Sequence, residues 1–308
     1  MRASDADPAG GPQPEVLAIT GPTGSGKSRI AQELAEASPE RVVLVAMDSL
    51  QVYRGMDIGT AKPNARERAR YLGLDVVNPD EEFSVQAWLE MIEPALEHEL
   101  AQGRLPVLVG GTGYYLRALS EGTYLGPKSD PRVRGWLEAR LEGEGLEALR
   151  RELTAASPAD ASRAGVNPRR VLRALEVLEL TGKPPAAQAW RRPRVKVRKL
   201  AVHAGRAALV HRLSERVLEQ LKQGLLNEVA GLVSRYGRHI APLQAIAYRE
   251  PARFLAGEID HDAMIEETWT RNRAYARRQV TWLRAEPGVT WHDPDALAAV
   301  AASWIAQS

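Results

Sequence analysis

The sequence contains no cysteine, so disulfide bonds and thiolate metal sites are excluded. It also lacks any apolar run near the ~20 residues that a membrane-spanning helix requires. Its first residues, MRASDADPAGGPQP, have no apolar core of the kind that defines a signal peptide. We therefore expect a cytoplasmic protein with no membrane partner.

The net charge is also low, because 41 lysines and arginines are balanced by 39 aspartates and glutamates, which leaves +2. A balance so close to zero does not by itself indicate a nucleic-acid partner. A hydrophobic content of 44% and a charged content of 26% are typical of a soluble globular protein. The length of 308 residues suits one large domain or two smaller ones. Residues 1–14 are small, polar and rich in proline and glycine, which predicts a disordered tail.

The stretch GPTGSGKS, residues 21–28, is the most informative motif present. It fits the phosphate-loop pattern G-x-x-x-x-G-K-[ST] at every fixed position. EVLAIT (15–20) before it predicts a buried strand and RIAQELAEA (29–37) after it predicts a helix, which is the setting that the motif requires. Loop N–H groups are expected to surround a phosphate, with Lys27 on the outer phosphate and the Ser28 hydroxyl on Mg²⁺. The alternative is a glycine-rich hairpin that carries Lys-Ser by chance.

Two further strands end in polar or glycine-rich turns. RVVLVAM (41–47) predicts a buried strand that ends at Asp48, where a carboxylate would face the crevice at the carboxyl end of a parallel sheet. The alternative use of Asp48 is as a turn or helix-cap residue. PVLV (106–109) predicts another strand, followed by the turn GGTG. KLAVH (199–203) predicts a fourth strand.

Basic residues gather in three places. NPRRVLRALEV (167–177) predicts a helix capped by Asn167 that carries three arginines, RRPRVKVRK (191–199) has six basic residues of nine, and a helix over 270–284 carries five arginines. The usual interpretation of such clusters is a solvated helix face. Three of them in a chain of nearly zero net charge favour a surface for a polyanion.

These patterns predict an α/β fold, with a P-loop NTPase-like parallel sheet covered by helices and an inserted helical domain. The core is expected to comprise residues 15–122 and 198–308. Residues 123–197 are expected to form the insertion, because residues 130–190 carry helical patterns without a convincing strand.

Taken together, the motifs resemble those of the tRNA dimethylallyltransferase (tRNA isopentenyltransferase) family, in its bacterial form. The resemblance rests on the phosphate loop, on DSLQVYRGMDIGTAKP (48–63), on GGTGYYL (110–116), on NPRRVLRALEV, and on QAIAYRE (244–250) with RRQVTWLR (277–284). It covers roughly residues 15 to 292, and the block that begins at Asp48 is the most specific part. The chain departs from the family at Ala247, where glycine is usual.

The resemblance implies transfer of a dimethylallyl group from dimethylallyl diphosphate to the exocyclic N6 amine of adenosine 37 in tRNAs that read codons beginning with U. It implies Mg²⁺ as cofactor, nucleotide binding at the same loop, and a monomer. Asp48 would act as the general base, while Thr23, Lys27 and Arg216 would stabilise the leaving diphosphate. The implied diphosphate- or nucleotide-binding residues are Gly21, Pro22, Thr23, Gly24, Ser25, Gly26, Lys27 and Ser28, the last also holding the metal. The implied tRNA-contacting residues are Asp48, Ser49, Leu50, Gln51, Thr112, Arg134, Arg169, Arg170, Val171, Leu172, Arg173, Leu243, Gln244, Ala245, Ile246, Ala247 and Tyr248.

Two other classes of protein remain open at this stage. A P-loop kinase of a nucleoside or small metabolite would use the same phosphate loop, and residues 123–197 would then form an arginine-bearing lid. A non-catalytic RNA-binding NTPase switch would combine the loop with the basic clusters. The block from Asp48 to Pro63 and the basic helix near the C-terminus favour the tRNA-modifying enzyme.

Overall fold

The structure, a computed structural model, describes residues 13–124 and 126–308. Within it the chain forms two units, one that comprises the chain up to Ser120 together with Pro193–Ser308, and one that comprises Glu121–Arg192. Most of the predicted disordered tail, residues 1–12, lies outside the described residues. For Gln13 and Pro14 the prediction is wrong: Gln13 Nε2 donates to the Pro193 carbonyl at 2.9 Å, and the Pro14 carbonyl accepts the N–H of Lys196 at 2.9 Å.

The first unit is built on a six-stranded sheet with the order β3-β2-β4-β1-β5-β6, in which every neighbouring pair is parallel. The strands are β1 (Glu15–Thr20), β2 (Val42–Ala46), β3 (Tyr71–Leu72), β4 (Leu105–Gly110), β5 (Lys196–Val202) and β6 (Val289–His292). The four predicted strands are confirmed, and the two short edge strands were not predicted. Strand β5 begins at Lys196, so the predicted end of the insertion at residue 197 is too late.

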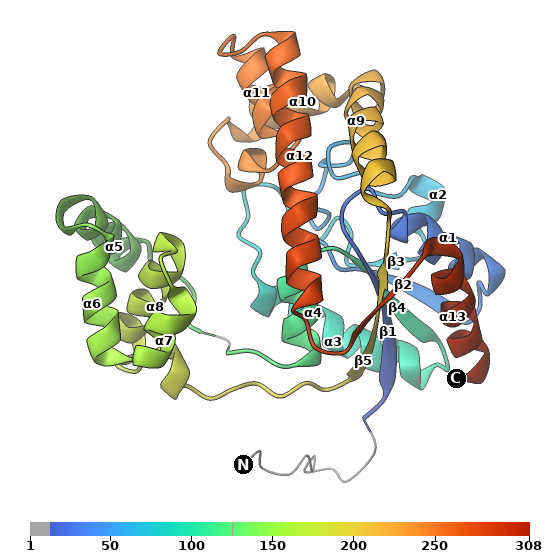
Figure 1. Cartoon of the computed structure of the whole chain (residues 1–308), viewed down its shortest axis with the longest axis horizontal. Coiled ribbons are helices and arrows are strands. Elements are labelled where there is room, and N and C mark those ends of the chain that lie inside the picture. Colours follow the sequence, from blue (N-terminus) through green and yellow to red (C-terminus); the bar gives the residue numbers. More distant parts are fainter. Residues whose placement is uncertain (1–12, 125) are drawn as a thin grey trace. The chain divides into compact units, whose positions relative to one another are not determined.

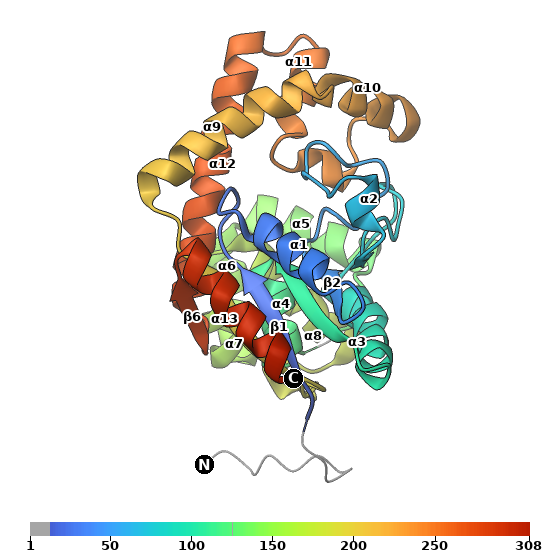
Figure 2. The ribbon, with the colours of Figure 1, turned by 90° about the vertical axis from the view of Figure 1, so that its right-hand side faces the viewer.

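Strand β1 is central, since Ile19 pairs with Val109 of β4 on one side and with Leu200 of β5 on the other. Alternate residues of a strand face opposite sides of its sheet. Leu17 and Ile19 accordingly join one core cluster with helices α1 (Lys27–Ala37) and α13 (Pro294–Gln307). Figure 2 shows these two helices side by side over the sheet. This packing fixes the position of the phosphate loop, which follows the C-terminal end of β1.

Helices α3 (Val85–Ala101) and α4 (Gly113–Ser120) pack beside the sheet and against each other. Trp88 of α3 donates its indole N–H to the Ala46 carbonyl at 3.3 Å and stacks on Tyr115 of α4 at 4.6 Å between ring centroids. Ser84 caps α3 by accepting the N–H of Ala87 at 3.2 Å. The short helix α2 (Ala65–Arg68) precedes β3.

Four helices of the first unit extend beyond the carboxyl ends of the strands (Figure 1). They are α9 (Arg206–Lys222), α10 (Leu225–Tyr236), α11 (Arg249–Leu255) and α12 (His261–Arg284), with the 3-10 turn η2 (Ala241–Gln244) between α10 and α11. Helix α12 begins well before the predicted Thr270. Asp260 caps it by accepting the N–H of Ala263 at 2.8 Å, and Met264 and Thr268 extend its buried face towards the N-terminus.

Within the second unit the described residues of 130–190 contain helices and no strand, as predicted. The elements are α5 (Pro131–Glu144), α6 (Leu146–Ala156), α7 (Pro158–Ala164), α8 (Pro168–Thr181) and the 3-10 turn η1 (Pro185–Ala187). Asn167 caps α8 as predicted, Asp130 caps α5, and each precedes a proline at the first helical position. The helices enclose a small core of their own that includes Leu137, Leu153 and Val171.

No helix in the described part of the chain is long and apolar enough to cross a membrane.

Candidate active site

The phosphate loop connects β1 to α1 as the sequence predicted. Gly26 precedes α1 in a left-handed conformation with φ of 93°, which favours glycine. No side chain caps the helix at this position, and its first turn carries no acidic residue. The first backbone N–H groups of α1 therefore remain available for an anion, and the positive end of the helix dipole points towards it.

Lys27 is the first residue of α1 and lies in a cavity at the carboxyl end of the sheet. Its ammonium group is 3.4 Å from the Pro22 carbonyl, a weak hydrogen bond. Burial lowers the pKa of Lys27 to about 8, while the charge of Asp48 raises it and that of Arg216 lowers it. The charges that act on Lys27 are thus one carboxylate and one further cation, and two cations beside one carboxylate favour an additional anion at this point of the cavity.

Asp48 follows β2 and lines the same cavity. One of its carboxylate oxygens accepts the N–H of Leu50 at 2.9 Å, so the turn interpretation is correct for one oxygen. The charge of Asp48 also acts on its neighbours, since it raises the pKa of Lys27 and of Tyr275. The carboxylate of Asp48 therefore stabilises its own turn and also contributes its negative charge to the cavity.

The cavity has a volume of about 790 Å³. Its polar lining comes from elements far apart in the sequence: Thr23, Lys27 and Ser28 from the phosphate loop and α1, Asp48 from the end of β2, Arg216 from α9, and Gln279 from α12. Arg216 forms no ion pair with the described residues, and burial lowers the pKa of its guanidinium while Asp48 raises it. The four predicted catalytic residues, Asp48, Thr23, Lys27 and Arg216, thus line one space.

Gln279 is a site residue that the sequence interpretation missed. Its Oε1 accepts the N–H of Thr23 at 2.8 Å, and its Nε2 donates to the Gly111 carbonyl at 3.0 Å. A Cβ on Gly111 would lie 2.2 Å from Gln279 Nε2, so a larger residue there would displace this amide from its hydrogen bonds. One buried amide therefore joins the phosphate loop to the second glycine-rich turn. The available signal was a polar residue flanked by arginines and by Val280 in RRQVTWLR.

The second glycine-rich turn also holds the residue after Asp48. The Thr112 hydroxyl accepts the N–H of Ser49 at 3.1 Å. Gln51 is committed to its own loop, where Nε2 donates to the Thr60 carbonyl at 3.2 Å, while Leu50 packs against an apolar cluster. Within this conformation Thr112 and Gln51 position the Asp48 loop, and contact with tRNA remains a prediction for them.

Glu228 of α10 is a second missed residue, and it organises the loop that follows Asp48. Its carboxylate accepts the N–H groups of Asp57, Ile58 and Gly59 at 3.0, 2.7 and 3.2 Å. It also accepts the hydroxyl hydrogen of Tyr248 at 2.7 Å. Tyr248 is fully buried, and burial together with Glu228 raises its pKa. In this conformation the side chain of Tyr248 anchors the loop, and a contact between Tyr248 and tRNA remains a prediction.

The segment from Leu243 to Ala247 is divided between the core and the cavity. Leu243 is buried in the apolar cluster beside Tyr248, whereas Ala245 and Ile246 line the cavity. The Gln244 carbonyl accepts Arg271 at 3.3 Å. Ala247 is buried with φ of 67°, a left-handed conformation that disfavours any side chain. Its backbone therefore adopts the geometry for which the family's usual glycine is suited.

The predicted tRNA contacts of the second unit fall into two groups. Val171 and Leu172 are buried in its core, so their side chains cannot contact RNA in this conformation. The arginines are nearer the surface but most are engaged: Arg134 pairs with Glu138 at 2.8 Å, Arg170 donates to the Arg163 carbonyl at 3.3 Å, and Arg173 pairs with Glu176 at 2.8 Å. Arg169 is exposed.

The predicted basic stretch 191–199 is not uniformly a surface for a polyanion. Lys199 is buried and pairs with the buried carboxylate of Glu286 at 2.8 Å. Arg194 lies 3.2 Å from Glu97 and 3.5 Å from Glu93. The misinterpretation has a physical cause: these residues belong to or precede β5, so their partners come from distant helices and turns.

A Mg²⁺ ion bound with a diphosphate fits the groups in this cavity. Ser28 is exposed in the first turn of α1, and its hydroxyl makes no hydrogen bond with the described residues. The described part of the chain holds no cluster of three metal-binding side chains. Magnesium in phosphate sites typically takes only one or two protein oxygens and completes its shell with phosphate and water. Ser28 can supply such an oxygen.

Comparison with known proteins now defines the family. The model of the family described as IPP transferase matches residues 51–286. Among curated relatives, the tRNA dimethylallyltransferase of Thermus thermophilus is 50% identical over 272 residues, which cover 88% of this chain and 89% of the relative. The corresponding protein of Deinococcus radiodurans is 36% identical over 301 residues, or 96% and 98% of the two chains. The chain belongs to the IPP transferase family.

Solved structures agree with this membership. The full-length tRNA isopentenylpyrophosphate transferase of Bacillus halodurans matches with a TM-score of 0.70 and 34% identity, covering 96% of both chains. A eukaryotic dimethylallyltransferase, solved in the course of its action on tRNA, matches with a TM-score of 0.76 and 26% identity, covering 91% of this chain and 74% of that one. The predicted P-loop NTPase-like α/β fold is confirmed.

Proposed function

We propose that this protein is a tRNA dimethylallyltransferase. It would transfer the dimethylallyl group of dimethylallyl diphosphate to the exocyclic N6 amine of adenosine 37 in tRNAs that read codons beginning with U. The observation that carries the proposal is the convergence of a phosphate loop, an aspartate and an arginine on one cavity of about 790 Å³. A metabolite kinase is disfavoured by the family membership and by the Asp48 loop, which the structure builds into the cavity wall.

The leaving group is the diphosphate. As the bond between the allylic carbon and the bridging oxygen breaks, negative charge develops on the diphosphate. The free N–H groups at the start of α1, together with Lys27 and Arg216, are placed to stabilise that charge. Mg²⁺ held by Ser28 and the diphosphate would supply Lewis-acid stabilisation of the same charge. The loop's ability to hold a nucleotide in place of the diphosphate belongs to the same proposal.

The nucleophile is the adenine amine, which forms a bond to the allylic carbon and must lose a proton. Asp48 is the cavity carboxylate whose charge acts on Lys27, and it can accept the proton because Leu50 occupies only one of its oxygens. The target base has to leave the stack of the anticodon loop to reach such a group. Gln279 accepts the N–H of Thr23 and would thereby hold the phosphate loop in its position in the cavity wall.

Recognition of tRNA would rest on accessible basic groups rather than on the buried residues that the sequence also suggested. The exposed Arg169 and Arg170 and the partly exposed Arg134 of the second unit are the candidates for phosphate contacts, and Ile246 and Ser49 for contacts near the cavity. A cytoplasmic, monomeric enzyme is part of the proposal and rests on the sequence alone.

The decisive test is a single-turnover assay with an unmodified tRNA transcript and labelled dimethylallyl diphosphate. We expect label in the tRNA at adenosine 37 and release of diphosphate, both dependent on Mg²⁺. Labelled ATP in place of the prenyl donor should transfer no phosphate to tRNA or to nucleosides. Phosphate transfer without prenylation would establish a kinase, and RNA binding with neither reaction would establish a non-catalytic switch.

A further inference from the structure

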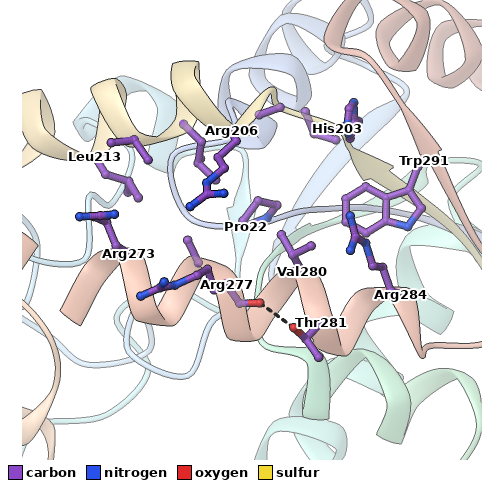
Figure 3. A pocket seen from close by; sticks show the side chains of 15 residues that line it. Pro22, His203, Arg206, Leu213, Arg273, Arg277, Val280, Thr281, Arg284 and Trp291 are labelled. Atoms are coloured by element: carbon purple, nitrogen blue, oxygen red, sulfur yellow. Dashed lines mark hydrogen bonds between the residues drawn. The ribbon is translucent and has the colours of Figure 1, made fainter. Parts of the chain in front are cut away.

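A second cavity, of about 630 Å³, lies on the other side of α12 from the candidate active site. Tyr275, Arg278 and Gln279 of this helix line the first cavity, whereas Ala276, Arg277, Val280 and Arg284 line the second. The opposite wall comes from the end of β5 and from α9, as Figure 3 shows. The function proposed above does not use this space.

The floor of the second cavity is apolar. Val202, Leu209, Leu213, Val280 and the indole of Trp291 contribute to it. Leu213 is buried, and Trp291 is partly exposed beside His203, with 6.4 Å between ring centroids. A pocket of this size and lining suits the apolar part of a small organic molecule.

The walls of the cavity carry positive charge without compensation. They include Arg206 of α9 and Arg273, Arg277 and Arg284 of α12, and none of the four forms an ion pair with the described residues. Among the described residues that line the cavity, none is acidic. Figure 3 shows Arg206 reaching down from α9 and Arg284 beside Trp291. Arginine forks bind carboxylate and phosphate oxygens in pairs, and four uncompensated arginines suit a ligand with the several negative charges of a diphosphate or triphosphate.

We propose that this cavity is a second ligand site, which binds an organic diphosphate or triphosphate that carries an apolar group. The arginines would hold the phosphates, and the apolar group would cover the floor formed by Val280 and Leu209. The backbone of RNA is the competing ligand for four arginines. It is disfavoured because the phosphates and sugars of a backbone are polar and would leave the apolar floor formed by Leu209, Leu213 and Val280 uncovered.

The second site lies directly behind the phosphate loop. Pro22 lines the cavity, and a Cβ on Gly24 would lie 3.1 Å from Leu213, so the floor side chains touch the loop. Both sites therefore share a wall, and a direct measurement must separate them. Lys27→Ala removes the principal side-chain cation of the loop and leaves the four arginines intact, which makes it a suitable background.

The test measures binding by calorimetry in the Lys27→Ala background with two probes and a reference. Geranyl diphosphate represents prenyl diphosphates, ATP represents nucleotides, and inorganic diphosphate lacks an apolar group. The test variant adds Arg206→Gln and Arg284→Gln, and the control variant adds Arg41→Gln and Arg235→Gln, which remove the same charge at exposed positions elsewhere. Melting temperatures establish that both variants fold.

We expect at least one organic probe to bind the Lys27→Ala protein, at least ~10-fold more tightly than inorganic diphosphate. The test variant should weaken that binding by ~10-fold or more, and the control by less than ~2-fold. Which probe binds identifies the source of the ligand. The proposal is overturned if neither organic probe binds this background, or if the test and control variants bind alike. It is also overturned if the test variant weakens binding of an anticodon stem-loop RNA but not of the organic probe.

Discussion

The lowered pKa of Lys27 predicts that affinity for a diphosphate falls as the pH rises through about 8. In the free protein the ammonium loses its proton early because burial and Arg216 disfavour its charge. A bound diphosphate places negative charge beside it and raises its pKa back towards or above the usual 10.5. Binding is therefore linked to proton uptake at Lys27.

This linkage gives the direction and the size of the change in diphosphate affinity with pH. At pH 7 and below, Lys27 is largely charged with or without diphosphate, and the affinity depends little on its titration. At pH 9 only about one-tenth of the free protein carries the charge, while the bound protein retains it. The dissociation constant should then be ~10-fold larger than at pH 7, or ~1.4 kcal/mol, and should rise by about one decade per pH unit until the bound state also titrates.

The assay is calorimetry with a non-reactive dimethylallyl thiodiphosphate, whose last phosphate ionisation falls near pH ~6, as in other phosphate esters. Measurements at pH 7 and 9, in two buffers of different ionisation enthalpy, give both affinity and proton uptake. Lys27→Arg is the matched control, because its guanidinium stays charged throughout this range. Equal affinity of the wild type at both pH values, or the same pH dependence in Lys27→Arg, would refute the reasoning.

Four further predictions concern single contacts. Asp48→Asn should lower single-turnover prenylation by roughly 10²–10⁴-fold with little change in binding, and near-normal turnover would rule out its role as base. Gln279→Met, which leaves the Thr23 N–H without its acceptor, should lower turnover by ~10–100-fold with tRNA affinity unchanged; a loss confined to tRNA affinity would contradict its positioning role. Ala247→Gly should raise the free energy of unfolding by ~0.5–1 kcal/mol in denaturant titrations, whereas Ala302→Gly at an exposed position of α13 should lower it by a similar amount. Replacing Arg169 and Arg170 by glutamine should reduce the slope of log K against log salt for tRNA by ~0.7 per lost contact, and an unchanged slope would leave both as solvated charges.

The parts of the fold that the sequence predicted are those with local causes. A buried strand followed by the phosphate-loop pattern determines β1 and α1, and Asn167, which precedes Pro168, determines the start of α8. Asp293-Pro294 opens α13 with the same chemistry, so this helix was predictable by the same argument. Strand β3 has only two residues, too few to show a periodic pattern.

The parts that escaped prediction depend on partners far away in the chain. Gln279 contacts a residue 256 positions earlier, and Glu228 holds N–H groups about 170 positions earlier. Nothing in the neighbourhood of either residue specifies those contacts, because they arise only when α10 and α12 pack over the ends of the strands. The same reason explains Lys199, which belongs to a basic stretch in the sequence and to a buried ion pair with Glu286 in the fold.

The buried residues that were predicted to contact tRNA show that a place in a family motif does not by itself specify what a side chain does. Tyr248 belongs to a block that resembles the family, yet its hydroxyl binds Glu228, whose carboxylate holds the loop after Asp48. Its effect on the reaction would therefore act through the shape of that loop. Val171 and Leu172 likewise place the neighbouring arginines by filling the core of the second unit.

Helix α12 separates two cavities of the first unit, because two of its faces line different cavities. With 3.6 residues per turn, Tyr275 and Gln279 fall on one face, and Ala276 and Val280 fall on another. The first face closes the candidate active site and holds Thr23, and the second forms part of the apolar floor behind the phosphate loop. Substitutions at 279 and at 280 should therefore affect different ligands although the residues are adjacent in sequence. Gln279→Met should impair turnover without loss of the second site, and Val280→Asp should abolish binding at the second site while the Thr23 hydrogen bond persists.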